Sequence, residues 1–120
     1  MTSLTPTYAV NKVCTKTITY TAMGASTDGV AFENPEYGLK TVQAYGTFGG
    51  TVTIQGSNDP LGISTPASAV WATLTADGTN ALTFTAAGLK KIHENPRFIR
   101  AISGAGVSDV DIVIQCTEGG

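Results

Sequence analysis

The chain contains 120 residues, of which 13% are charged, and its formal net charge at pH 7 is -2. This length fits one domain spanning residues 1–120, and the slightly acidic balance offers no basic surface to a nucleic acid. No apolar run approaches the roughly 18 residues that cross a bilayer, so we expect neither nucleic acid nor membrane as a partner. The 19 threonines and 14 glycines favour extended, turn-rich structure, because threonine is branched at Cβ and glycine opens turns.

The first third of the chain predicts one regular strand between two less regular segments. Residues 1–7 carry four hydroxyl groups and a proline, so they form a possible N-terminal arm, and they lack the pattern of a secretion signal. Residues 8–13 form either a strand or a continuation of the arm. Residues 15–21 alternate strictly, with four threonines on one face, and predict a strand. Residues 23–38 carry repeated turn signals and predict a long irregular stretch, either mobile or held by a partner.

The middle of the chain predicts a hairpin followed by a capped loop. Residues 39–48 and 51–55 read as two strands, and the Gly49-Gly50 pair between them predicts a hairpin turn. Residues 57–60 have the sequence SNDP, whose side chains cap turns by hydrogen bonding to nearby backbone.

The last third predicts three strands and one short connection. Residues 80–85 alternate, with the leucine and the phenylalanine facing inward. Residues 86–94 form the only plausible helix, which we interpret as a short helix or an irregular connection that ends before Pro96. Residues 97–103 and 110–116 close the chain as strands. Together these elements predict an all-β fold: an antiparallel β-sandwich, jelly-roll or immunoglobulin-like, with at most one short helix.

The side chains that most often carry catalysis are few. His93 is the only imidazole, and its charged surroundings beside a turn predict a solvated side chain. Cys14 and Cys116 lie near opposite ends of the chain, so a disulfide requires the terminal strands to be neighbours; we expect two buried free thiols instead. We therefore expect no catalytic residue and no enzyme activity.

Two pairs of carboxylates are close enough in sequence to be considered as acid and base catalysts. Glu33 and Glu36 flank an Asn-Pro turn, whereas Asp109 and Asp111 begin a strand, and solvation at the surface explains both pairs. The oxygens of residues 57–59 are too few for calcium, which takes about six to eight ligands. The sequence predicts no metal and no cofactor.

Three large side chains indicate binding surfaces. Trp71 follows a polar loop and is either a core anchor, the interpretation we favour, or a platform for a sugar ring. Arg97 and Arg100 interrupt an apolar strand, so each needs a carboxylate, a contact surface or an edge-strand position. The sequence predicts a possible interface between subunits at Arg97, Arg100, Glu33 and Glu36.

A series of short motifs resembles a pattern found in small structural proteins of tailed bacteriophages. The motifs are GTFGGTVTIQGSNDP at residues 46–60, WATL at 71–74, ALTFT at 81–85 and NPRFIR at 95–100. They are similar to those of capsid decoration, or cement, proteins. A similar order of motifs occurs in discoidin-like sugar-binding sandwiches, and the first 40 residues resemble no family.

The resemblance implies a β-sandwich that clamps a virus shell, commonly as a homotrimer seated where capsomers meet. We therefore expect a non-enzymatic virion structural protein, made in the host cytoplasm, that decorates the capsid surface and bridges subunits of the major capsid protein. The alternative is a carbohydrate-binding module of a phage tail or cell-surface protein, with Asn58, Asp59 and Trp71 at the sugar.

Overall fold

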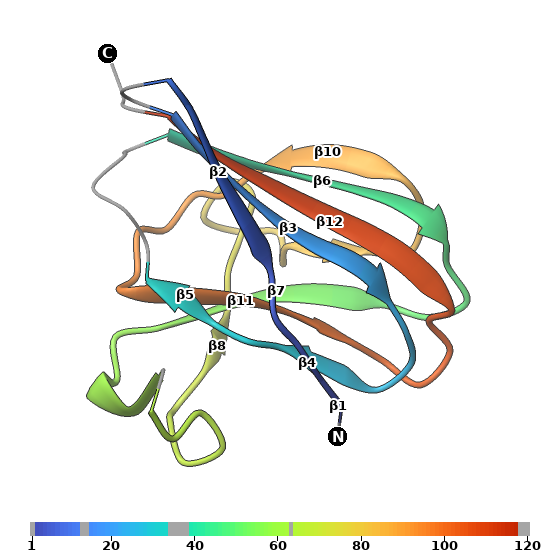
Figure 1. Ribbon diagram of the computed structural model, residues 1–120, viewed down its shortest axis with the longest axis horizontal. Helices are drawn as coiled ribbons and strands as arrows, with labels where there is room; N and C mark the ends of the chain where they lie inside the picture. The colour runs from blue at the N-terminus through green and yellow to red at the C-terminus, as the bar shows by residue number, and fades with distance from the viewer. Residues whose placement is uncertain (1, 13–14, 34–38, 63, 118–120) are drawn as a thin grey trace.

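Two β-sheets packed face to face make up the fold (Figure 1). The computed structural model describes residues 2–12, 15–33, 39–62 and 64–117. The five-stranded sheet contains, in spatial order, β10 (Gly88–Lys91), β6 (Leu39–Thr47), β12 (Asp109–Thr117), β3 (Thr15–Met23) and β2 (Thr7–Lys12).

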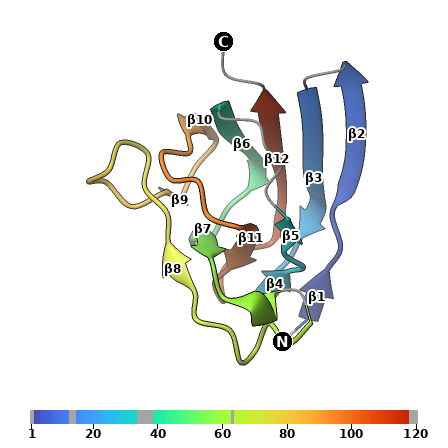
Figure 2. The ribbon, with the colours of Figure 1, turned by 90° about the vertical axis from the view of Figure 1, so that its left-hand side faces the viewer.

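The second sheet has seven strands and lies beneath the first in the side view (Figure 2). Its spatial order is β1 (Thr2–Leu4), β4 (Thr27–Gly29), β11 (Phe98–Ser103), β7 (Val52–Ser57) and β8 (Ala72–Thr73). Two short strands complete it, β5 (Phe32–Glu33) on β11 and β9 (Thr83–Phe84) on β7. Every described pairing is antiparallel except that of β1 with β4, so the predicted all-β sandwich is confirmed.

The core lies between the two sheets and follows from the alternation of the strands. In β12, the side chains of Val110, Ile112, Ile114 and Cys116 point inward and are each 0% exposed. Their partners from the other sheet include Ile99 in β11, which is also fully buried in the same cluster. Strict alternation therefore predicted which face of this strand is buried.

Residues 86–94, predicted to be a short helix or an irregular connection, contain the strand β10 instead of a helix. Its residues Gly88 to Lys91 pair antiparallel with β6, with Leu89 opposite Gln43. A segment of nine residues with a glycine inside it gains little as a helix, whereas the edge of β6 offers backbone partners. A single 3-10 turn, Pro60–Gly62, interrupts the β structure, and no helix among the described residues is long and apolar enough to span a membrane.

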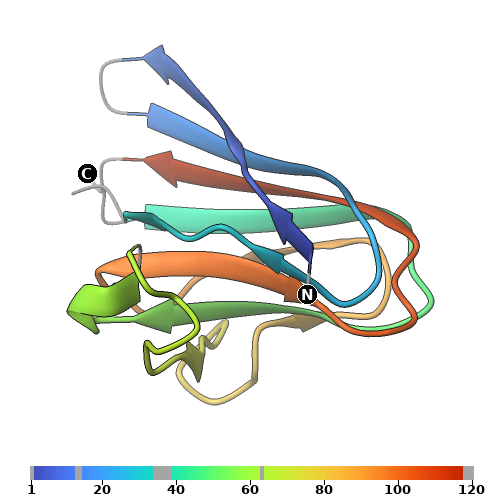
Figure 3. The ribbon, with the colours of Figure 1, turned by 60° about the horizontal axis from the view of Figure 1, so that its bottom comes forward.

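The predicted hairpin around Gly49 and Gly50 is also wrong, although both of its strands exist. β6 belongs to the five-stranded sheet and β7 to the seven-stranded sheet, so the glycines carry the chain from one layer to the other (Figure 3). The connection packs tightly against the loop after β11, where a Cβ at Gly106 would overlap the carbonyl oxygen of Gly49. The glycines permit this approach of two backbones.

Two segments predicted to be irregular are more ordered than expected. Residues 23–38 contain β4 and β5, while residues 34–38 lie outside the described residues. The predicted N-terminal arm at residues 1–7 instead contributes β1 to one sheet and the start of β2 to the other, with Pro6 buried at the crossing. Pairing of β1 with β4 holds this segment against its own domain.

Candidate functional site

A groove of about 520 Å³ lies on the outer side of the seven-stranded sheet. Its floor comes from β1, β4 and β11, and the loop before β8 forms one wall. Outward-facing Asp28 and Arg100 are its charged lining residues, and Trp71 is its aromatic one. The rest of the lining is small or apolar apart from the Ser3 hydroxyl, and includes Val30, Pro66, Ala67 and Ala69.

Arg100 is held in place by two contacts. Its guanidinium lies 4.1 Å from the centre of the Trp71 ring, a distance typical of a cation stacked on an aromatic face. Its Nε donates a hydrogen bond of 2.9 Å to Oε1 of Gln55 on the neighbouring strand. The indole Nε1 of Trp71 in turn donates to the carbonyl oxygen of Pro66 at 3.0 Å, which fixes the ring on the loop.

Asp28 carries the opposite charge in the same groove. Partial burial lowers the pKa of Arg100, and the negative charge of Asp28 acts in the opposite direction. Within the described part of the chain, these two side chains form no ion pair: no nitrogen of Arg100 lies within 4.0 Å of a carboxylate oxygen of Asp28. The groove therefore presents a guanidinium and a carboxylate that influence each other without direct contact.

The outer side of the five-stranded sheet is a second surface, broad and almost uncharged. One row crosses all five strands, with each of these residues opposite the next: Leu89, Gln43, Val113, Thr19 and Thr7. We call this surface the neutral face and define it by the outward residues Thr7, Thr17, Thr19, Thr41, Gln43, Tyr45, Leu89, Val113 and Gln115.

The charged side chains described beside the neutral face are few. Lys91 lies opposite Thr41 on the β10 edge, and Asp111 lies opposite Tyr45 on β12, with Asp109 at the start of that strand. Two of its apolar members are well exposed, Leu89 at 65% and Tyr45 at 43%. Strand spacings of about 4.8 Å and a rise of about 3.3 Å per residue give this face, which spans five strands and about five residue positions along each, an area of about 400 Å².

The three residues predicted for a sugar site do not meet in one hollow. Trp71 lines the groove with Arg100, whereas Asn58 lines a separate hollow of about 360 Å³. The Asp59 carboxylate accepts hydrogen bonds from the backbone nitrogens of Leu61 and Val70, both 3.0 Å, as predicted for a side-chain-capped turn. Asn58 Oδ1 accepts one from the backbone nitrogen of Arg97 at 2.8 Å.

Trp71 lies outside the core, contrary to the interpretation that we favoured. Its side chain is half-buried on the outer side of the sheet, where it stacks on Arg100. The edge-strand explanation is also wrong for Arg100, because β11 is an interior strand between β4 and β7, whereas Arg97 precedes this strand. Aromatic stacking and a side-chain amide, rather than an edge position, accommodate Arg100.

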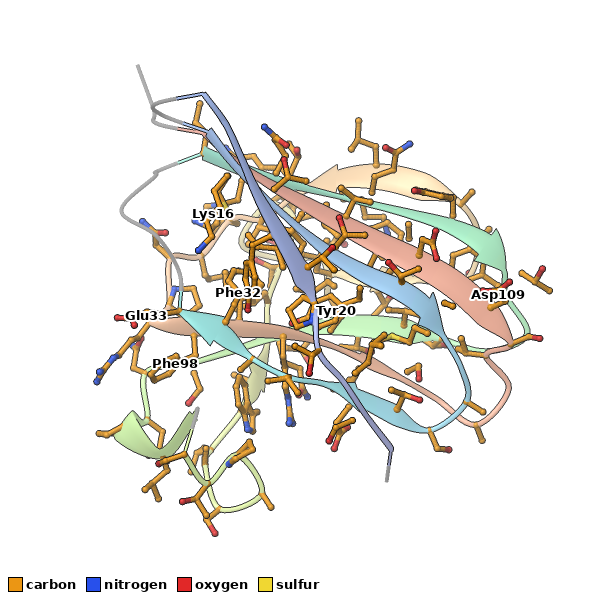
Figure 4. All side chains as sticks on the ribbon, viewed as in Figure 1. Lys16, Tyr20, Phe32, Glu33, Phe98 and Asp109 are labelled. Atoms are coloured by element: carbon orange, nitrogen blue, oxygen red, sulfur yellow. The ribbon has the colours of Figure 1, made fainter. Side chains whose placement is uncertain are left out.

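Of the residues predicted for a subunit interface, Glu33 and Arg100 lie on strands of the seven-stranded sheet, and Arg97 directly precedes β11. Arg97 is exposed, with its guanidinium 4.8 Å from the centre of the Phe98 ring. Exposed Glu33 pairs with Phe98 across β5 and β11, and both appear at one end of the molecule in Figure 4. Glu36 lies outside the described residues. An interface at these positions stays a prediction.

The remaining candidate acids and His93 occupy the surface. His93 is exposed and lies near Asp77 and Glu94. Asp109 is exposed at the opposite end of the molecule from Glu33 (Figure 4). Asp111 accepts a 2.8 Å hydrogen bond from the backbone nitrogen of Ala22. Within the described residues, no group of three or more histidine, cysteine or acidic side chains is placed to hold a metal ion.

A buried lysine and thiol lie opposite one another between the sheets. Lys40 in β6 is 2% exposed, faces Cys116 across the strands, and donates from Nζ to Oδ1 of Asn95 at 2.5 Å. Burial lowers the pKa of Lys40 and raises that of Cys116 to about 11. The prediction of a buried free thiol is confirmed for Cys116, whereas Cys14 lies outside the described residues.

Sequence reasoning missed Asp28 and Gln55 as partners of Arg100. Asp28 lies in a stretch that was expected to be irregular, so the outward alternation of β4 gave no signal. Gln55 belongs to a strand whose sheet was predicted wrongly. The available signal was indirect: an arginine between apolar neighbours and a lone tryptophan after a polar loop both require partners.

The fold is similar to that of a phage-derived protein. No family model matches the sequence, and no curated protein matches it. The SPBc2 prophage-derived protein YomS matches with a TM-score of 0.64 and 11% identity, over 92% of this chain and 100% of that chain. At such low identity the likeness shows a shared fold alone.

Two other solved structures are more distant. A cupin domain from Bordetella pertussis has a TM-score of 0.40 and 10% identity, over 97% of this chain and 95% of that chain. A protein from Neisseria meningitidis has a TM-score of 0.44 and 11% identity, over 93% of this chain and 83% of that chain. Neither likeness is close enough to inform the function.

Proposed function

We propose that this chain is a non-enzymatic structural protein of a phage virion. In this proposal it decorates the capsid surface, as a homotrimer, and stabilises the shell by bridging subunits of the major capsid protein. The neutral face is the observation that carries the proposal. Its position on one complete sheet makes it available as a single docking surface.

The chemistry of the neutral face suits attachment to a protein shell. An area of about 400 Å² is about half of the roughly 800 Å² that each partner buries in a standard interface, so the neutral face supplies about half of such a contact. Because the nine residues that define it are uncharged, its burial avoids most of the desolvation cost that ionic groups carry. Threonine hydroxyls and glutamine amides supply hydrogen bonds, and exposed Leu89 and Tyr45 supply apolar contact.

The fold shared with a prophage-derived protein supports a phage context for this proposal. The motif resemblance to capsid decoration proteins points the same way. A module that works by surface contact also gives a role to this nearly uncharged sheet surface.

A comparison of phage heads with and without the protein tests the proposal. Heads that carry the protein are expected to release their DNA at a higher temperature and to survive osmotic shock better. A Gln43→Lys variant places a charge at the centre of the neutral face and is expected to weaken binding to heads at least about tenfold.

The matched control is Thr73→Lys, which places the same charge on an exposed strand position of the other sheet. It is expected to bind heads as the unmodified protein does. Equal resistance of heads with and without the protein would rule out the stabilising role. Equal binding of both variants would rule out the neutral face as the docking surface.

A further inference from the structure

We propose that the groove of Asp28, Trp71 and Arg100 binds a neutral saccharide, with Arg100 donating to one sugar hydroxyl and Asp28 accepting from another. This site lies on the opposite sheet from the neutral face and goes beyond attachment to a capsid. It does not use Asn58 or Asp59, whose side-chain oxygens already accept hydrogen bonds from backbone nitrogens.

Arg100 is fixed in position with donor capacity to spare. Stacking on Trp71 and the hydrogen bond from Nε to Gln55 set the plane of the guanidinium. A guanidinium carries five N–H donors in a rigid fork, and the bond to Gln55 uses only the one on Nε. Arg100 lines the groove, and its two contacts set the orientation of its terminal nitrogens, which lowers the entropic cost of binding a ligand.

Asp28 supplies the complementary acceptor. It lies on β4, directly opposite Ser3 of β1, and both side chains line the groove. A carboxylate accepts hydrogen bonds only, whereas the guanidinium only donates. The groove thus offers oriented donors and a carboxylate acceptor on one floor, separated by more than an ion-pair distance.

This combination disfavours a ligand with a net charge and suits a neutral polyol. A free carboxylate attracted to Arg100 is repelled by Asp28, and an amine attracted to Asp28 is repelled by Arg100. A hydroxyl group both donates and accepts, so neighbouring hydroxyls on one sugar ring satisfy both side chains without a net charge. A ligand that bridges Arg100 and Asp28 also supplies hydrogen bonds to two partly buried charged groups that form no ion pair with each other.

The walls of the groove fit the apolar faces of a sugar ring. Pro66, Ala67 and Ala69 present small apolar surfaces, and the exposed part of Trp71 adds an aromatic one. A volume of about 520 Å³ falls within the roughly 300–1,000 Å³ of small-molecule sites. The fit is that of a short saccharide lying between the sheet and the loop.

Titration of the intact chain with simple sugars tests this site. Trp71 is the only tryptophan, so its fluorescence reports directly on the groove. The probes are methyl glucoside, methyl galactoside, methyl mannoside and N-acetylglucosamine, each to about 50 mM because single-ring ligands bind weakly. At least one is expected to change the fluorescence saturably, and calorimetry with the same sugar is expected to give the same Kd.

Substitution at the two charged residues is expected to weaken binding of that sugar. Arg100→Met and Asp28→Asn should each raise its Kd about tenfold or more, because each removes charge-assisted hydrogen bonds. Arg100→Lys keeps the charge but loses the fork, so it should also weaken binding if Arg100→Met fails to fold. Lys90→Met is the matched control, since it removes a cation 4.9 Å from the Phe84 ring, away from the groove.

Three outcomes would overturn the proposal. The first is no saturable response to any sugar of the panel. The second is unchanged sugar affinity in the Arg100 and Asp28 variants, with thermal unfolding confirming that they fold. The third is saturable binding of sodium acetate that Asp28→Asn strengthens, which would identify an anion site instead.

Discussion

Arg100 shows how an interior strand can carry a charged side chain on the outer face of its sheet. Its neighbours Ile99 and Ala101 are fully buried, so the alternation of β11 places the guanidinium on the outer face. There the ring of Trp71 and the side-chain amide of Gln55 replace water molecules that the guanidinium loses through partial burial. Lys40, between the two sheets, is likewise a buried cation with a side-chain amide as partner: it lies opposite Cys116 and donates a hydrogen bond to Asn95.

The buried thiol of Cys116 predicts a loss of stability at alkaline pH. Its folded-state pKa is about 11, above the unfolded value of about 8.5, so the unfolded chain loses this proton first. The protonated thiol therefore contributes fully to the free energy of unfolding below a pH of about 8.5. This contribution, on the order of 1–3 kcal/mol, is lost as the pH rises through about 11.

Urea unfolding at neutral and alkaline pH measures this effect against Cys116→Ala. The variant lacks the thiol and should lose less stability over this pH range. Burial of Lys40 acts in the opposite sense in both proteins, because its lowered pKa makes the folded state more stable as the pH rises. Parallel pH profiles for the two proteins would contradict the assignment to Cys116.

Glu94 predicts a second, acidic dependence. Burial acts to raise its pKa, but hydrogen bonds from the Thr75 backbone nitrogen and hydroxyl, at 2.7 and 2.5 Å, bring the net pKa below its usual value. The resulting stabilisation is complete above about pH 4.3 and is lost as the pH falls through the folded-state pKa.

Glu94→Gln should therefore cost about 1 kcal/mol at neutral pH and progressively less toward pH of about 3. Chemical denaturation at several pH values measures the difference. Glu33→Gln, at an exposed position of β5, is the control and should have little effect at any pH. A difference for Glu94→Gln that stays constant with pH would argue against this role of the carboxylate.

At the scale of the element, the strands were easier to predict than their partners. Alternation identified residues 15–21 and 110–116 because each strand has one face in the core. The assignment of β6 and β7 to one hairpin failed because sheet membership depends on contacts far apart in sequence. The fit of the Gly49-Gly50 connection against Gly106 is of this long-range kind.

That close approach predicts a sharp difference between two glycines of the same loop. Gly106→Ala should destabilise the fold by about 1–3 kcal/mol, because its Cβ would overlap backbone that cannot move aside easily. Gly104→Ala is the control, since its Cβ would approach the Thr51 carbonyl oxygen no closer than 3.4 Å. Equal thermal stability of the two variants would contradict the tight packing of the two sheet connections.

The bulge in β3 and β12 predicts a stabilising substitution. Ala22 has a φ of 54°, in the left-handed region that costs an L-residue about 1–2 kcal/mol. Ala22→Gly should relieve this strain and raise stability by about 1 kcal/mol, whereas Ala72→Gly, on an exposed strand, should lower it. Thermal melts of both variants measure these changes in stability. A lower melting temperature for Ala22→Gly would contradict the strain at Ala22.

At the scale of the whole molecule, the sequence predicted the sandwich but not the position of the groove on its surface. Turn signals and short alternating segments sufficed for an all-β fold. The groove could not be predicted because Asp28, Trp71 and Arg100 come from separate segments that only the folded sheet and loop bring together. The neutral face was foreshadowed by the threonines of residues 15–21, which do lie on the outer side of β3 where the structure describes them.

The proposed homotrimer gives a prediction for the assembled protein. Native mass spectrometry should show a species of about 37 kDa, three times the 12.3 kDa chain. A Gln43→Lys variant that remains trimeric while losing affinity for heads would assign the neutral face to the shell rather than to the trimer. A monomer mass at all concentrations would contradict the trimeric part of the proposal.

The path of the first strands has a practical consequence for anyone who produces this protein. β1 begins beside the groove, and Ser3 contributes to its lining, whereas β12 ends at Thr117 at the far end of the molecule (Figure 1). An affinity tag fused ahead of the first strand would crowd the proposed sugar site and compete with the pairing of β1. Purification handles and surface-immobilisation chemistry therefore belong at the carboxyl terminus.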